Sequence, residues 1–246
     1  MILNAEKITL ADIGAVLRRG VHEYRQLILP SSVYALAPAL IGLILLAVVG
    51  SYGVSPMSLP FAGGFMLAAP AMLTGFFQMS LSLEKGESPG VADPFLASIR
   101  APAGVWMVAV FCAFMFAIWI TDAGVLYAFL IGGVELPYAL PWLVPPKDEV
   151  FTFWLWGSLM GSVLAFIIFA VSAFSVPLLF ERRANLVDAV MASVKAVFRN
   201  FIPCLSWGLL ISLAVIAAII VLPALVVVLP ILAYASFALY RRVFPA

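Results

Sequence analysis

The sequence predicts an all-α polytopic membrane protein, a single membrane domain whose chain crosses the bilayer six times. Of its 246 residues, 65% are hydrophobic and only 10% are charged, and the mean hydropathy is +1.17. Soluble domains carry about 25% charged residues, so lipid must solvate much of this chain. Long charge-free runs and a one-sided distribution of basic residues determine the number and direction of the predicted spans.

Six apolar stretches are each long enough to cross the hydrocarbon core, which takes about 20 helical residues. Residues 26–83 carry no charge but are too many for one helix, and the turn-rich stretch 51–58 divides them. A second charge-free run, 200–240, is divided near Pro223. The six predicted spans are 28–50, 59–83, 101–120 with an extension past Asp122 to Gly132, 151–180, 201–220 and 222–240.

Basic residues lie almost entirely on one side of this six-span arrangement. Of the 13 lysines and arginines, all but Lys147 fall in the segments 1–27, 84–100, 181–199 and 241–246. Basic residues favour the cytoplasmic side of a membrane. The sequence therefore predicts that both termini are cytoplasmic.

A short pattern recurs before each predicted pair of spans: an aspartate followed seven residues later by a basic residue. The three strings are DIGAVLRR from Asp12, DPFLASIR from Asp93 and DAVMASVK from Asp188. Seven residues make two helical turns, so both charges lie on one face of an amphipathic surface helix. We expect three pseudo-repeats of one surface helix and one hairpin, at 8–83, 91–180 and 184–243. The alternative is a chance match in a biased composition.

Two sets of polar residues are candidates for function. Basic side chains on the surface helices are expected to contact anionic headgroups or partner subunits. These are Arg18, Arg19, Arg100, Arg182, Arg183, Lys195 and Arg199. Polar groups in or beside spans are costly to bury and so are also candidates, namely Gln78, Glu84 and Asp122. Interhelical hydrogen bonding, capping and snorkelling are the alternatives for this second set.

The residues that most enzymes and metal proteins require are nearly absent. His22 is the single histidine, and Cys112 and Cys204 lie apart within apolar runs. No metal, haem, phosphate-binding or nucleophile-elbow motif occurs. We therefore expect no cofactor and no enzymatic activity, and the net charge of +1 gives no indication of nucleic-acid binding.

Two segments resemble a known family. Residues 58–90, beginning SLPFAGG, and 174–212, beginning FSVPLLF, are similar to two blocks of domain of unknown function 2189, a bacterial group of predicted integral membrane proteins. The chain departs from the family pattern at Phe76, Phe77, Gln78 and Ser82, where charged residues are usual. The resemblance implies an inner-membrane protein of no established activity, although some members are labelled as cytochrome c oxidase subunits.

Two functions fit these observations. The first is a non-catalytic accessory or assembly subunit of a larger membrane complex, for which a respiratory complex is one option. The alternative is a transporter or permeation protein for a small apolar solute or lipid, since the predicted spans include proline-broken helices and a repeat. In either case we expect the lipid bilayer, and in the first case other membrane subunits, as partners.

Overall fold

The computed structural model describes residues 4–51, 55–57, 60, 70–132 and 147–245, and every regular element within these ranges is helical. A helix lies over each of the three aspartate strings: α1 (Leu10–Gln26), α5 (Asp93–Ile99) and α9 (Leu186–Arg199). The remaining elements are mostly apolar. They are α2 (Ile28–Ser51), η1 (Ser55–Met57), α4 (Pro70–Glu84), α6 (Ala103–Leu130), α7 (Asp148–Ser172), α8 (Ser175–Phe180), α10 (Phe201–Ile220), η3 (Leu222–Ala224) and α11 (Leu225–Val243).

Four of the described helical segments are long and apolar enough to cross a membrane: Ala103–Leu130, Asp148–Phe180, Phe201–Ala218 and Leu225–Val243. A fifth is added if α1 and the first part of α2, which meet at a bend of 103°, count as one broken span. The described residues thus give four or five candidate spans where the sequence predicts six. In the predicted span 59–83, residues 59 and 61–69 lie outside the described residues. The described part from Pro70 onward is α4.

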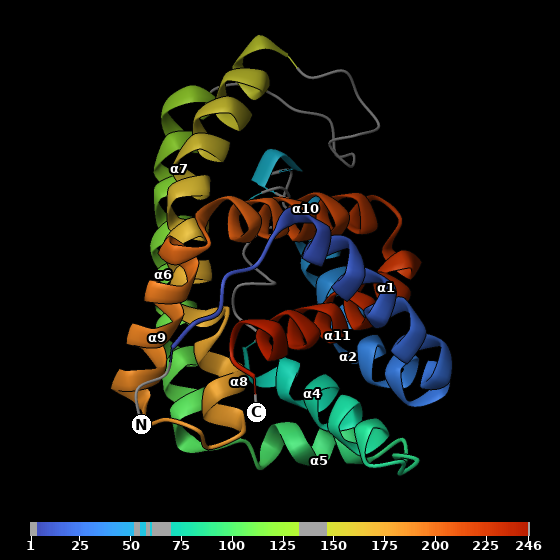
Figure 1. Cartoon of the computed structure of the whole chain (residues 1–246). Helices are drawn as coiled ribbons and strands as arrows, with labels where there is room; N and C mark the ends of the chain where they lie inside the picture. Colours follow the sequence, from blue (N-terminus) through green and yellow to red (C-terminus); the bar gives the residue numbers. More distant parts are fainter. Residues whose placement is uncertain (1–3, 52–54, 58–59, 61–69, 133–146, 246) are drawn as a thin grey trace.

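The spans run in two directions (Figure 1). α6 and α7 form a long pair, and α10 and α11 run across that direction in this view. Ala103–Leu130 has 28 residues and Asp148–Phe180 has 33, well above the roughly 20 that a perpendicular helix needs, so both are long enough to tilt. The described helices therefore do not stand as six parallel spans.

The centre of the molecule is α11. Of its membrane-crossing stretch, 56% is buried inside the protein, compared with 22% for α6. α1 packs along α11 and approaches it closely at Gly20, where an added Cβ would lie only 2.5 Å from the carbonyl oxygen of Ile231. Phe77 of α4 stacks on Phe237 of α11 with ring centroids 4.9 Å apart.

The two ends of the described chain lie side by side. The backbone N–H of Glu6 donates to the carbonyl oxygen of Val243, 2.8 Å away. Asn200, between α9 and α10, accepts a hydrogen bond from the N–H of Ile8 and donates one to the carbonyl oxygen of Glu6. The segment before α1 is therefore fixed to the end of α11 and to the junction of α9 and α10.

Candidate functional site

Five charged side chains form a continuous series of ion pairs across the ends of the helices, which we call the ion-pair chain. Arg19 of α1 contacts Glu84 at the end of α4, with nitrogen and oxygen 2.6 Å apart. Glu84 also lies 3.5 Å from Arg241 near the end of α11, and Arg241 is 2.6 Å from Glu181, which follows α8. Arg183 completes the series 3.9 Å from Glu181. The ion-pair chain thus connects α1, α4, α8 and α11.

Further hydrogen bonds hold both ends of the ion-pair chain. At one end, the buried carboxylate of Glu23 accepts hydrogen bonds from Arg19 and from Ser80, each 2.7 Å long. At the other end, Tyr240 donates to Glu181 at 2.5 Å and accepts from Arg183 at 3.0 Å. Glu23, Glu84 and Glu181 are therefore each engaged by an arginine.

Arg183 also binds the end of the chain. Its guanidinium donates to the carbonyl oxygens of Phe244, at 2.8 Å, and Pro245, at 2.6 Å. Arg242, next to the ion-pair chain, pairs with Asp12 at the start of α1. The first helix is thus attached to the last directly through Asp12 and indirectly, through Glu84, by way of Arg19.

The structure places the predicted basic residues in two groups. Arg19 and Arg183 contact carboxylates of the protein itself. The other members of the set are exposed, and no ion pair to them occurs in the described ranges; they are Arg18, Arg100, Arg182, Lys195 and Arg199.

The three repeat aspartates make similar local hydrogen bonds. Each carboxylate reaches back three residues and accepts a hydrogen bond before its helix: Asp12 from the N–H of Thr9, Asp93 from the N–H of Gly90, and Asp188 from the side-chain amide of Asn185. The bond to Asp12 belongs to a capping box at the start of α1, whereas α9 is capped by Asn185, whose side-chain oxygen accepts a hydrogen bond from the N–H of Asp188. For Asp12, the hydrogen bonds from the backbone and side chain of Thr9 lower the carboxyl pKa below its ordinary value of 3.8.

The polar span candidates do not come together. Glu84 belongs to the ion-pair chain, whereas Gln78 of α4 and Asp122 of α6 are half-buried. The sequence prediction missed Glu23, Glu181 and Arg241. For Glu23 a signal existed, since it follows Arg19 by four residues and so lies on the same helical face.

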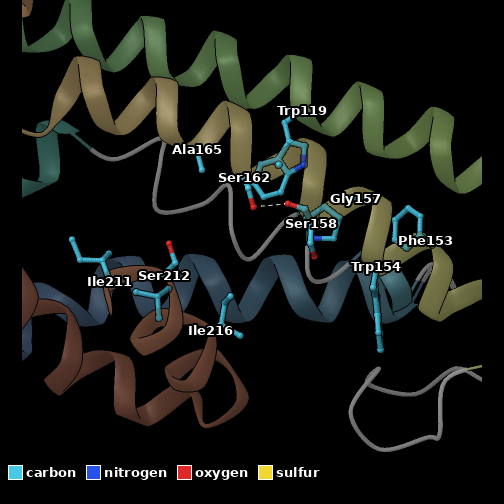
Figure 2. A pocket seen from close by; sticks show the side chains of 13 residues that line it. Trp119, Phe153, Trp154, Gly157, Ser158, Ser162, Ala165, Ile211, Ser212 and Ile216 are labelled. Carbon is cyan, nitrogen blue, oxygen red and sulfur yellow. Dashed lines mark hydrogen bonds between the residues drawn. The ribbon is translucent and has the colours of Figure 1, made fainter. Parts of the chain in front are cut away.

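A second feature is a hollow of about 210 Å³ between α7 and α10, shown in Figure 2. On the α7 side it is lined from Phe153 to Ala165, including Ser158 and Ser162, and on the α10 side by Ser212 among apolar residues. The hydroxyl of Ser162 donates to the carbonyl oxygen of Ser158, 2.6 Å away. The hollow is therefore an apolar space with a few hydroxyl groups.

Trp119 of α6 forms part of this hollow by packing directly on Gly161 of α7. A Cβ added at Gly161 would lie 2.7 Å from the indole ring. The indole Nε1 is buried and has no hydrogen-bond partner in the described part of the protein. The glycine thus serves the close contact between α6 and α7, with one indole N–H left unsatisfied.

No group of three or more histidine, cysteine, aspartate or glutamate side chains in the described residues could hold a metal ion. Neither the ion-pair chain nor the hollow presents a recognisable catalytic arrangement.

Comparison with known proteins places the chain in a family. The family model described as predicted integral membrane protein, domain of unknown function 2189, matches residues 58–181. The match includes all of the first block identified in the sequence but ends eight residues into the second, which begins at 174. No curated protein and no solved structure matches the chain. The chain therefore belongs to the domain of unknown function 2189 family of predicted integral membrane proteins.

Proposed function

We propose that the protein is a non-catalytic accessory or assembly subunit of a larger complex in the bacterial inner membrane, of which a respiratory complex is one option. The observation that carries the proposal is the hollow between α7 and α10. Its α7 side is lined from Phe153 to Ala165, a length of roughly 18 Å at 1.5 Å per helical residue. That is more than half of the hydrocarbon core, which is about 30 Å thick.

The face of α7 that lines the hollow has a composition that suits packing against a helix of another membrane protein. Ser158, Ser162 and Ala165 follow one another at spacings of four and three, so these small side chains lie on one face of α7. Small residues at this spacing let helix backbones approach closely in membranes, where packing rather than water drives association. One transmembrane helix of a partner subunit would cover this face.

The ion-pair chain supports a non-catalytic role. Its two carboxylates, Glu84 and Glu181, and the adjoining Glu23 are held by arginine, and Ser80 and Tyr240 add hydrogen bonds to Glu23 and Glu181, so all three are engaged in connecting helices. A group that is fixed in this way is poorly suited to moving a proton through the membrane.

Purification of the tagged full-length chain in mild detergent tests the proposal. We expect a stoichiometric membrane partner to accompany the wild-type protein, and Ser162→Trp, which fills the hollow, to release it. Val163→Trp is the matched control, because Val163 is exposed on α7 and does not line the hollow. A wild-type chain that purifies without a partner, or a partner that is retained equally by both variants, would contradict the proposal.

The proposed topology has six spans with both termini in the cytoplasm. The hydrogen bond between Glu6 and Val243 supports an even number of spans, since it holds the two ends of the described chain together. Cysteine labelling in intact cells tests this arrangement after Cys112 and Cys204 are replaced. Lys147→Cys should react with an impermeant maleimide from outside, and Lys85→Cys only after the membrane is opened. The opposite labelling pattern would refute the orientation.

The alternative is a transporter or permeation protein for a small apolar solute or lipid. The observation that favours it is the presence of Ser158, Ser162 and Ser212 in an otherwise apolar hollow, which could accommodate a weakly polar molecule. Reconstituted vesicles should then move such a solute or lipid, and Ser162→Trp should stop the movement. Equal movement with wild-type protein, the variant and empty vesicles would exclude this function.

A further inference from the structure

A second cavity lies where α6 begins, α8 ends and α9 begins. It is open to the outside, has a volume of about 440 Å³, and is separate from both the hollow and the ion-pair chain. Met107, Leu179 and Leu186 provide apolar walls, and Arg182 and Asn185 provide the polar side chains. A cavity that combines one cation with apolar walls is suited to an amphiphile that carries an acidic group.

The backbone directs two successive arginines to different surroundings. Arg182 has a φ of 56°, and the N–H groups of Arg182 and Arg183 donate to the carbonyl oxygens of Leu179 and Leu178. This pattern ends α8, and glycine is the usual residue at the position with positive φ. Arg183 extends into the ion-pair chain, whereas Arg182 is exposed and lines the cavity.

The cation in this cavity is free to bind. Within the described residues, no ion pair or side-chain hydrogen bond engages Arg182, whereas Asn185 is occupied because its amide donates to Asp188 and its carbonyl oxygen caps α9. Arg100, also exposed and without an ion pair in the same ranges, lies two residues before Pro102, which lines the cavity. Arg182 is thus the available donor within the cavity.

The cavity is located where the charged and apolar surfaces of the protein meet. Met107 on its wall is 56% exposed, and Val110, one helical turn further along α6, is 68% exposed. Exposed apolar side chains of a spanning helix face lipid or another apolar partner. The guanidinium of Arg182 therefore lies beside the start of an apolar surface. A phospholipid has the matching arrangement, with its phosphate next to its acyl chains.

We propose that this cavity binds the phosphate group of an anionic glycerophospholipid, with Arg182 as the phosphate ligand and with the acyl chains along Met107 and Val110. A guanidinium presents two parallel N–H donors that match a phosphate. The bound lipid would fix the depth of α6 and α9 in the membrane. The site is independent of the proposed partner helix at the hollow.

Native mass spectrometry of the full-length protein, with added phosphatidylglycerol as the probe, tests this site. Arg182→Gly is the informative variant, because it removes the side chain and places glycine where the backbone favours it. We expect this variant to retain phosphatidylglycerol about fivefold more weakly, which is what one basic residue contributes at an anionic membrane surface. Its melting temperature should be equal to or above that of the wild type, so lost binding would not reflect unfolding.

Arg18→Ala is the matched control, since Arg18 is exposed on α1, has no ion pair in the described ranges and does not line the cavity. It should bind phosphatidylglycerol as the wild type does. If Arg182→Gly retained phosphatidylglycerol as strongly as the wild type, the proposal would be overturned. Equal retention of phosphatidylcholine would overturn the preference for an anionic lipid, and displacement by inorganic phosphate at the same concentration would indicate a free-phosphate site instead.

Discussion

Two helix pairs of this protein are joined through glycine, but their surroundings differ. α1 and α11 approach at Gly20 and are further connected by the ion pair of Asp12 with Arg242 and, through Glu84 of α4, by Arg19 and Arg241. α6 and α7 approach at Gly161, yet their outer surfaces stay exposed and apolar, and most of α6 is unburied. The comparison indicates that α1 and α11 belong to a closed core, whereas α6 and α7 present a surface to lipid or to a partner.

The largest expected effect is the loss of Glu181 from the closed core. In Glu181→Ala, Arg241 and Arg183 lose a carboxylate that is only 10% exposed, and breaking a buried ion pair costs about 3–5 kcal/mol. Unfolding in a series of detergent mixtures should report a loss near this size. Asp122→Ala on α6, which removes a carboxylate outside any ion pair of the described residues, should cost far less. Similar losses for the two variants would show that the core does not depend on the ion-pair chain.

Gly20→Ala should have the next largest effect. The added methyl group would meet a backbone carbonyl, which cannot move without shifting α11, so we expect a loss of about 1–3 kcal/mol in unfolding free energy. Gly14→Ala, on the same helix with nothing within 4 Å of the added Cβ, should stabilise by about 0.5–1 kcal/mol. If both substitutions had the same sign, the close contact of α1 and α11 would be refuted.

Gly161→Ala tests the exposed pair in the same way. Its methyl group would meet the ring of Trp119, a side chain that can shift, so we expect the smaller loss of about 1 kcal/mol. Gly124→Ala, which is open on α6, is the control and should not destabilise. A loss larger than that of Gly20→Ala would reverse the ranking of the two helix pairs.

The smallest effect concerns pH. Because the folded state lowers the pKa of Asp12, its contribution to stability is fully present above the unfolded value of 3.8 and is lost as pH falls through the folded value. A titration of the melting temperature below pH 4 should show this loss in the wild type and a shallower one in Asp12→Asn. Parallel titration curves would mean that the hydrogen bonds from Thr9 to Asp12 do not stabilise the folded protein.

Local patterns predicted much of the helical structure. The expected span 201–220 is α10, and a helix covers each of the three aspartate strings. The last span begins at Leu225 rather than Leu222. Residues 222–224, which include Pro223, form a short 3-10 helix before it. The extension past Asp122 was correct in part, since α6 continues to Leu130. These features depend on neighbours in sequence, which a single sequence displays.

The ion-pair chain and the hollow depend on contacts between distant residues. Arg19 and Glu84 are 65 positions apart, and no local spacing relates them. Basic residues at the ends of spans suggest lipid or a partner, and only the fold shows that two of them, Arg19 and Arg183, find carboxylates of the same chain. The hollow likewise requires residues of α7 and α10 to face each other, which no pattern within either helix predicts.

The pairing of α1 with α11 has a consequence for biogenesis. Asp12 and Arg242 are 230 positions apart, so α1 is synthesised long before its main partner. Until α11 is made, the Gly20 face of α1 has no helix to cover it, and Arg19 and Glu84 lack their link to Arg241. The first helix must therefore wait for its partner through nearly the whole of translation, and a ribosome that stalls before α11 would leave it undocked and open to proteolysis.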